Sequence, residues 1–184
     1  MVGAVVTQLN SNMIFSENYA GIAGGAVYMS GVCLGLRLEG ARFTSNSALI
    51  GGAVYTTGSG IAITEDKYGK PQENPTTFIG CKFIGNKAVK TGGALDSGAG
   101  IDLIVNTSFV RKTAAIGGAL RLVGTISLEG CDFIENLSDE DEGPGISNNG
   151  VITDLSRCTF VKNVFNCQPG FYLEYNEVRP VSHT

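Results

Sequence analysis

Short apolar runs rich in β-branched residues recur along the chain between glycines. Clear examples are 61–63 (IAI), 101–105 (IDLIV), 125–128 (TISL) and 151–153 (VIT). Each run alternates or is wholly apolar over only a few residues, and none is followed by apolar positions at helical spacing. The pattern therefore predicts many short strands separated by turns.

A longer motif organises these runs. A phenylalanine is followed three residues later by asparagine, then by Gly-Gly-Ala and then by a further glycine, and the motif recurs every 24 to 40 residues. The motif is complete after Phe15, Phe43 and Phe83, and weakened copies follow Phe109, Phe133 and Phe160. A motif of several parts that recurs at one mean period indicates a repeat array.

Each repeat is interpreted as three strands: one ending at the phenylalanine, one after Gly-Gly-Ala and one after the single glycine. Three short strands and three turns in about 26 residues are typical of a coil in a β-solenoid. The sequence therefore predicts an all-β, single-stranded right-handed parallel β-helix of about six coils over residues 1–165. Residues 166–184 are interpreted as a terminal coil or tail, and the polar segment 65–75 (EDKYGKPQENP) as a loop inserted on one flank.

In such a fold, equivalent residues of successive coils lie above one another at the strand spacing of about 4.8 Å. The phenylalanines would form an aromatic column in the core. The asparagines would form a ladder of hydrogen-bonded amides, as in other stacked parallel strands. Its members are Asn18, Asn46, Asn86, Asn136 and Asn163, and Lys112 occupies the remaining position.

The pairing of F-x-x-N with G-G-A-[VL] between Phe15 and about Gly150 resembles the repeat of the chlamydial polymorphic outer membrane proteins, which also occurs in surface proteins of protists and algae. The resemblance implies a right-handed parallel β-helix displayed outside the cell as an adhesin or a stalk. The segment 167–172 (CQPGFY) is similar to the opening of a cysteine-rich extracellular module that often follows such repeats in eukaryotic surface proteins.

Composition excludes several function classes. The formal net charge of −4 argues against a nucleic-acid partner, which requires a basic surface. No apolar run approaches the length of a membrane span, and residues 1–10 lack the features of a signal peptide. Carboxylates do not recur at one coil position, so we expect no catalytic groove and no enzyme activity. We also expect no cofactor, and 139–142 (DEDE) is interpreted as a solvated turn rather than a calcium site.

Two surface features are candidate sites. The residue after each phenylalanine becomes apolar in the last four repeats. Two interpretations stay open: the chain bends and tucks these side chains against the corner, which is the favoured interpretation, or they form a docking stripe. The stripe comprises Ile84, Val110, Ile134 and Val161. Asn106 begins an N-x-S glycosylation motif and would be accessible, whereas Asn136 begins another but belongs to the ladder. Cys131 and Cys158 occupy the same position in neighbouring repeats, and free thiols are favoured over a disulfide because stacked cysteines are poorly aimed for one.

The sequence thus predicts a non-enzymatic extracellular or cell-surface module with a structural, adhesive or assembly role, as part of a larger protein or complex. The alternative is a carbohydrate-binding or carbohydrate-active β-helix. Gly3 precedes Phe15 by the same interval that separates Gly31 from Phe43, so the chain opens inside a coil. We expect that coil end to be covered by an upstream segment, a second copy or another subunit. Protein partners are expected at the coil ends or the stripe, and a glycan is a further candidate ligand.

Overall fold

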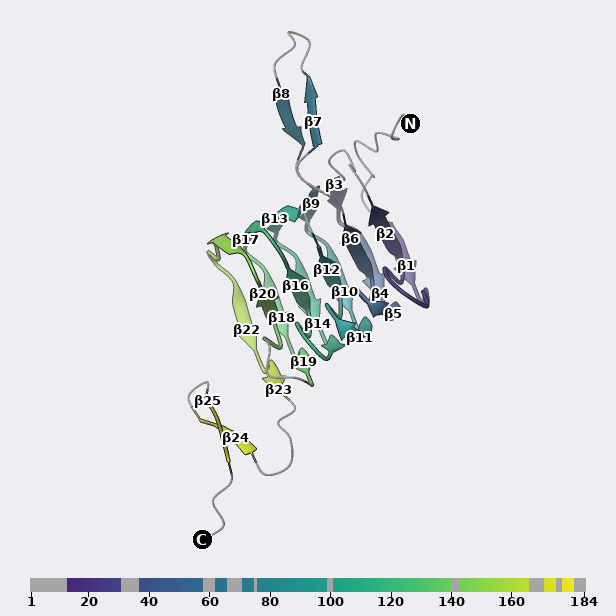
Figure 1. Ribbon diagram of the computed structural model, residues 1–184. Coiled ribbons are helices and arrows are strands. Elements are labelled where there is room, and N and C mark those ends of the chain that lie inside the picture. The colour runs from purple at the N-terminus through teal and green to yellow at the C-terminus, as the bar shows by residue number, and fades with distance from the viewer. Residues whose placement is uncertain are drawn as a thin grey trace.

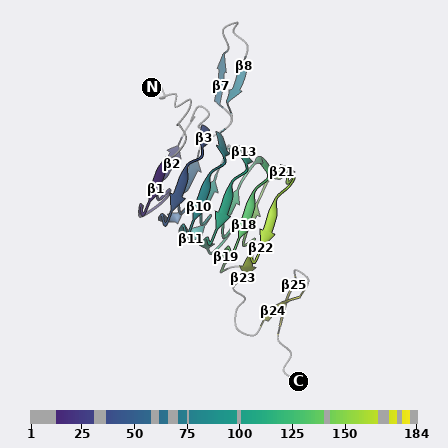
Figure 2. The ribbon, with the colours of Figure 1, turned by 180° about the vertical axis from the view of Figure 1, so that it is seen from behind.

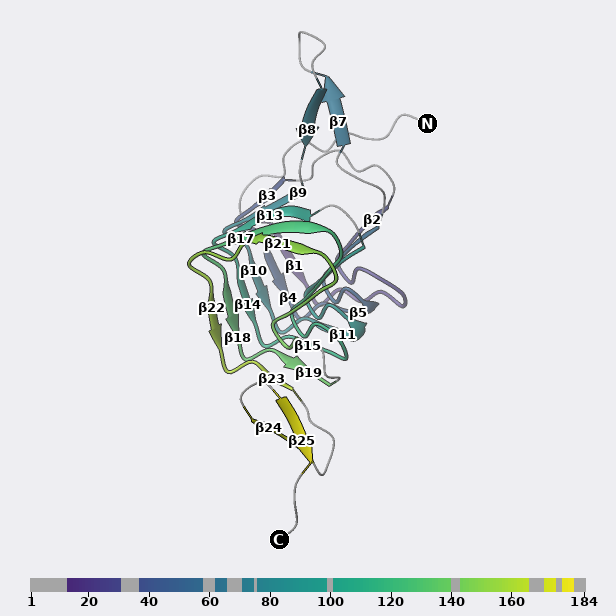
Figure 3. The same cartoon turned by 60° about the vertical axis from the view of Figure 1, so that its left-hand side comes forward.

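The computed structural model describes residues 13–30, 37–57, 62–65, 71–74, 76–98, 101–139, 143–165, 171–174 and 177–180. These residues contain strands and turns and no helix. Four parallel sheets wrap around a common interior, and successive turns of the chain stack into a β-solenoid (Figures 1 and 3). The predicted fold class is confirmed.

Each sheet collects one strand from successive coils. The first sheet holds the phenylalanines and consists of β1 (Ile14–Ser16), β4 (Arg42–Thr44), β10 (Lys82–Ile84), β14 (Ser108–Val110), β18 (Asp132–Ile134) and β22 (Thr159–Val161). The second consists of β5 (Ser47–Ile50), β11 (Lys87–Thr91), β15 (Thr113–Ala114), β19 (Leu137–Ser138) and β23 (Val164–Phe165). The third consists of β2 (Val27–Ser30), β6 (Val54–Thr57), β12 (Leu95–Ser97), β16 (Leu120–Leu122) and β20 (Ile146–Asn148). The fourth consists of β3 (Arg37–Glu39), β9 (Thr76–Ile79), β13 (Ile101–Val105), β17 (Thr125–Glu129) and β21 (Val151–Asp154).

A coil therefore contains four strands, and the prediction of three was wrong. The additional strand follows the asparagine and forms the second sheet. Its inward residues are small: Ala48, Ala88 and Ala114 are buried two residues after the ladder position. Four coils, beginning at β4, β10, β14 and β18, contribute a strand to every sheet, which is fewer than the six coils expected. The first coil meets the second sheet through isolated bridges at Tyr19 and Ala23.

The insertion, which lies within the second coil between β6 and β9, is longer than predicted. Residues 62–63, interpreted as part of a coil strand, belong to β7 (Ala62–Glu65), which pairs antiparallel with β8 (Pro71–Asn74). This hairpin extends away from the stack (Figures 1 and 2), and β9 takes the coil position instead. A second antiparallel hairpin, β24 (Phe171–Glu174) with β25 (Glu177–Pro180), lies beyond β23.

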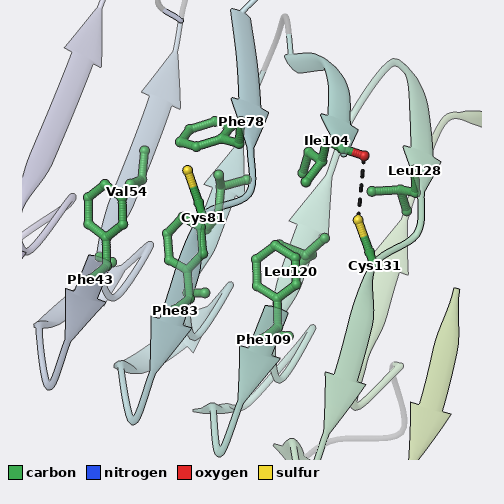
Figure 4. Close-up of a cluster of buried hydrophobic side chains, with 14 of the residues drawn as sticks. Phe43, Val54, Phe78, Cys81, Phe83, Ile104, Phe109, Leu120, Leu128 and Cys131 are labelled. Atoms are coloured by element: carbon green, nitrogen blue, oxygen red, sulfur yellow. Dashed lines mark hydrogen bonds between the residues drawn. The ribbon is translucent and has the colours of Figure 1, made fainter. Parts of the chain in front are cut away.

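The core is built from continuous columns (Figure 4). Ring centroids of successive phenylalanines in the first sheet lie 4.6 to 5.1 Å apart with nearly parallel planes. Two residues before each phenylalanine, a small or sulfur-containing side chain faces the same interior, as alternation along a strand requires. Cys81 and Cys131 belong to this column, and Cys131 Sγ donates to the Ile104 carbonyl (3.4 Å).

The two glycines of the Gly-Gly-Ala motif serve different purposes. Gly92 has a φ of 61°, in the left-handed region that other residues rarely adopt. Gly93 lies under the next coil, and a Cβ there would be 2.1 Å from the Gly118 carbonyl oxygen. In the last complete coil Pro144 takes the second position, and among the described residues no further strand of the third sheet lies beyond β20.

Candidate functional site: the ladder, the outer faces and the coil ends

The stacked asparagines form a ladder with a direction. Asn18 Nδ2 donates to Asn46 Oδ1 (2.8 Å), Asn46 Nδ2 to Asn86 Oδ1 (2.9 Å), and Asn136 Nδ2 to Asn163 Oδ1 (2.8 Å). The backbone N–H of each donor residue bonds the same oxygen. In these pairs the amide oxygen accepts from the preceding coil, and the amide nitrogen points a donor toward the following one.

The chain turns a corner next to the ladder through one residue with a left-handed backbone. This residue precedes the asparagine, although the turn preference of asparagine would place the left-handed conformation at the asparagine itself. The residues at this corner have φ values of 51° to 60° and share no side-chain type: Glu17, Ser45, Gly85, Arg111, Glu135 and Lys162. Glu135 and Lys162 stack in neighbouring coils, with Oε1 and Nζ 3.9 Å apart.

Lys112 interrupts the ladder. Its side chain is fully buried, and its Nζ donates to the Val110 carbonyl of its own coil (2.8 Å). Its backbone N–H still donates to Asn136 Oδ1 (3.0 Å). Burial, helped by the neighbouring Arg111 charge, lowers the pKa of Lys112 well below its usual 10.5. A column of neutral amides thus contains one lysine whose charged form is disfavoured.

The predicted docking stripe lies on the outer face of the first sheet. Ile84, Val110 and Ile134 are direct neighbours in the parallel register and half-buried, and Val161 follows at the edge with 40% exposure. All four remain partly open to solvent. The stripe is therefore continuous and becomes more exposed toward the last coil.

The outer face of the third sheet carries a row that the sequence pattern did not predict. Tyr28, Tyr55, Asp96 and Arg121 are register neighbours on β2, β6, β12 and β16. The ring centroids of Tyr28 and Tyr55 lie 5.5 Å apart. Asp96 is completely buried, although it points outward by alternation. It accepts a hydrogen bond from Thr91 Oγ1 and one from Arg121 Nη1 (3.2 Å).

The carboxylate of Asp96 lies between Tyr55 and Arg121 in this row and holds the Arg121 guanidinium. Desolvation by burial raises the pKa of Asp96, and the hydrogen bond from Thr91 and the Arg121 charge oppose that rise. The contact with Arg121 compensates the buried carboxylate, which would otherwise be costly to bury. The residues at this coil position are Tyr, Tyr, Asp, Arg and Ser in order, so the sequence shows no periodic signal for it.

The remaining candidates occupy separate places. Asn106 is exposed at a corner with a φ of 47°, so its accessibility agrees with the proposed glycosylation, and Asn136 is fully buried.

Cys81, Cys131 and Cys158 are free thiols, and burial raises the pKa of Cys131 to about 12. Asp139 is exposed, whereas residues 140–142 of the acidic segment lie outside the described part, as do Gly3 and residues 167–170.

Large exposed apolar side chains gather at the two ends of the stack. Within the described residues, ten such side chains are at least 40% exposed, and only Val89 belongs to an inner coil. Ile14, Tyr19, Ile22 and Tyr28 belong to the first coil. At the other end, the exposed side chains belong to the last strands of the first, second and fourth sheets or to the turn between β21 and β22: Val151, Leu155, Phe160, Val161 and Val164.

Among the described residues, no cluster of three or more His, Cys, Asp or Glu side chains is placed to hold a metal ion. The same residues include no helix long and apolar enough to cross a membrane. Compared with known proteins, the chain matches no family model, no curated protein and no solved structure.

Proposed function

We propose that this chain is a non-enzymatic extracellular or cell-surface module with a structural or adhesive role, joined to a larger assembly through the ends of its coil stack. The observation that carries the proposal is the concentration of exposed apolar side chains at those ends. Contiguous exposed apolar surface on a protein of this kind marks an interaction site. The extracellular location is supported by the resemblance of its F-x-x-N and G-G-A repeats to polymorphic outer membrane protein repeats.

Two further features support joining at the ends. β1 and β22 are the outermost described strands of the first sheet, and within the described residues no strand pairs with the outer edge of either. Such open edges favour strand addition. Beside β22 lies an apolar hollow of about 650 Å³, lined in part by Ile146, Ile152, Leu155 and Phe160. Solenoid ends of this type are stable in water when another unit covers them.

Sedimentation velocity over a range of concentrations tests this function. We expect the 184-residue chain to self-associate, and Val164→Lys, at the last coil, to reduce association. Val89→Lys is the matched control, because Val89 is similarly exposed (64% against 51% for Val164) but lies in an inner coil. A chain that stays monomeric at high concentration, or equal effects of both substitutions, would refute a role for the coil ends.

Carbohydrate binding is a second candidate function, favoured by the outer row of the third sheet. Tyr28 and Tyr55 provide aromatic faces, and Arg121 adds a partly exposed guanidinium held in place by Asp96. Aromatic faces with a few placed polar groups are common features of small-ligand sites. A glycan array comparing the unsubstituted chain with Tyr55→Ala, together with a reducing-sugar release assay, separates binding from hydrolysis. Equal array signals for both proteins would remove this candidate.

A further inference from the structure

We propose that the last coil of one molecule stacks on the first coil of a second copy, head to tail, with Phe160–Val164 in register with Phe15–Tyr19. This inference rests on the proposed function, because it takes the coil ends as the site of joining and names the partner and the register. The two segments read FVKNV and FSENY. Their side chains are complementary at four of the five positions.

The first complementarity is aromatic. Phe160 stacks on Phe133 at 4.8 Å with one ring face, and the residue remains 48% exposed. Phe15 stacks on Phe43 at 4.7 Å and is only partly buried. Both ends therefore offer a ring to a further member of the same column. Placing Phe15 of one copy on Phe160 of the other continues the stack at its own spacing.

The second complementarity lies in the direction of the ladder. Asn163 Oδ1 accepts from Asn136, and one Nδ2 hydrogen is used by the Phe133 carbonyl (2.8 Å). In the described part of the chain, the Asn163 backbone N–H and its second Nδ2 hydrogen have no acceptor. At the opposite end Asn18 donates to Asn46, and its Oδ1 accepts no hydrogen bond from any described residue. The last coil thus presents two donors and the first coil one acceptor.

The third complementarity is electrostatic. Lys162 and Glu17 occupy the same corner position, with the same left-handed backbone, at opposite ends of the stack. Within the chain, the Lys162 and Glu135 side chains at this position in adjacent coils already lie 3.9 Å apart. A second copy would bring Glu17 against Lys162 in the equivalent arrangement. Next to them, the exposed Val164 would meet the exposed Tyr19.

The same groups disfavour the other orientations. In tail-to-tail or head-to-head contact the two edge strands run antiparallel, so the phenylalanine, corner and asparagine columns cannot all continue. Two last coils would also bring two Lys162 side chains and two sets of amide donors into one contact, and two first coils would bring in two Glu17 side chains and two amide acceptors. Head-to-tail contact uses two different surfaces of each molecule, so it does not close on itself and copies add in a line.

The test uses two charge reversals in the 184-residue chain, measured by sedimentation velocity. Lys162→Glu alone and Glu17→Lys alone should each weaken self-association about three- to tenfold. An equimolar mixture of the two should associate as well as the unsubstituted protein, because the reversed tail then meets the reversed head. Arg111→Glu is the matched control, since Arg111 has the same corner position and backbone (φ 56°) in an inner coil, and it should leave association unchanged.

The pattern of outcomes separates the arrangements. If only Lys162→Glu matters, the contact is tail to tail; if only Glu17→Lys matters, it is head to head, and either result overturns the inference while leaving joining at the coil ends intact. If neither charge reversal changes the association, the head-to-tail inference is overturned as well. A monomeric unsubstituted chain instead refutes the proposed function itself.

A second pair of variants tests the ladder contact. Asn18→Ala and Asn18→Asp both lose the Nδ2 donation to Asn46 Oδ1 (2.8 Å), and the aspartate also places a second oxygen against that acceptor. A purely structural role therefore predicts that Asn18→Asp is at least as harmful as Asn18→Ala. Only Asn18→Asp keeps an oxygen that can accept from Asn163. We expect Asn18→Ala to weaken association about tenfold and Asn18→Asp to retain it. Equal loss in both variants would contradict the continued ladder.

Discussion

Replacing Lys112 by asparagine should stabilise the fold. In the uninterrupted part of the ladder, Asn86 Oδ1 accepts from the N–H and the Nδ2 of Asn46, both at 2.9 Å, and Asn86 Nδ2 donates to the Phe43 carbonyl at 3.0 Å. At Lys112 the side-chain oxygen is missing, and the buried Asn86 N–H has no acceptor in the described part of the chain. Lys112→Asn supplies that acceptor and a new donor.

The magnitude follows from the hydrogen bonds that form and the one that breaks. By analogy with the other coils, the substitution adds up to about four hydrogen bonds and removes the one from Nζ to Val110. At about 1 kcal/mol net for each bond, the stabilisation from hydrogen bonding is about 3 kcal/mol. Loss of buried methylenes costs about 2 kcal/mol. Removing a lysine that burial disfavours in its charged form stabilises the fold further, so we expect a net stabilisation of about 1 to 3 kcal/mol near neutral pH.

The pH dependence has a definite sign. The pKa of Lys112 is lowered in the folded state, so folding releases a proton and the destabilisation by Lys112 is fully present below the folded pKa. It fades as pH rises toward the unfolded value of 10.5. The advantage of Lys112→Asn should therefore be fully present below the folded-state pKa of Lys112, and it should shrink as pH rises toward 10.5.

Urea unfolding of the unsubstituted chain, Lys112→Asn and Lys112→Met measures these effects. Lys112→Met removes the titrating group without supplying ladder contacts, so the difference between the two variants isolates the ladder. A Lys112→Asn protein less stable than both others would show that the ladder is not continuous at this coil.

Three further substitutions or reactions test other parts of the stack. Asn136→Ala should lower the free energy of unfolding by about 1 to 3 kcal/mol more than Asn148→Ala. It leaves the Lys112 N–H without its acceptor and removes the donors to Phe109 and Asn163, whereas Asn148 accepts an exposed hydrogen bond from Gly150. Similar urea midpoints for the two variants would argue against the ladder. Gly93→Ala should strongly impair folding, because a Cβ there would lie 2.1 Å from the Gly118 carbonyl oxygen. Gly21→Ala should be tolerated, because the space around Gly21 is open. A thermal midpoint of Gly93→Ala equal to that of the unsubstituted protein would contradict the close approach of the coils. Iodoacetamide at about pH 8 should modify Cys158 well before Cys81 or Cys131 in the folded protein, because both are buried with raised pKa values; equal labelling by peptide mass spectrometry would contradict their burial.

The sequence predicts those features in which one residue type repeats with the coil. The phenylalanine column is of this kind, because a large ring has no alternative to the core, and so are the left-handed first glycines of the Gly-Gly pairs. The second sheet escaped prediction because its strands are as short as two residues at β15, β19 and β23. The inward residues of this sheet are mostly alanines, and such small side chains do not stand out as a periodic pattern of apolar positions in the sequence.

Other features depend on neighbours that only the folded chain brings together. Asp96 is buried by Thr91 and by register neighbours in adjacent coils, which no local pattern reveals. The left-handed corner before the ladder is occupied by Glu17, Gly85 and Lys162 among others, so composition gives no signal for it. The complementarity of Phe15–Tyr19 and Phe160–Val164 likewise could not be predicted from the sequence. It depends on the direction in which the ladder amides donate, and only the atom positions show that direction.

The most direct test of end-to-end joining is small-angle X-ray scattering of the 184-residue chain at increasing concentration. Head-to-tail stacking predicts that the particle length grows while the cross-sectional radius stays constant, because each copy continues the first sheet along the same axis. Growth of the cross-section, or scattering that remains that of a single molecule throughout, would contradict the account.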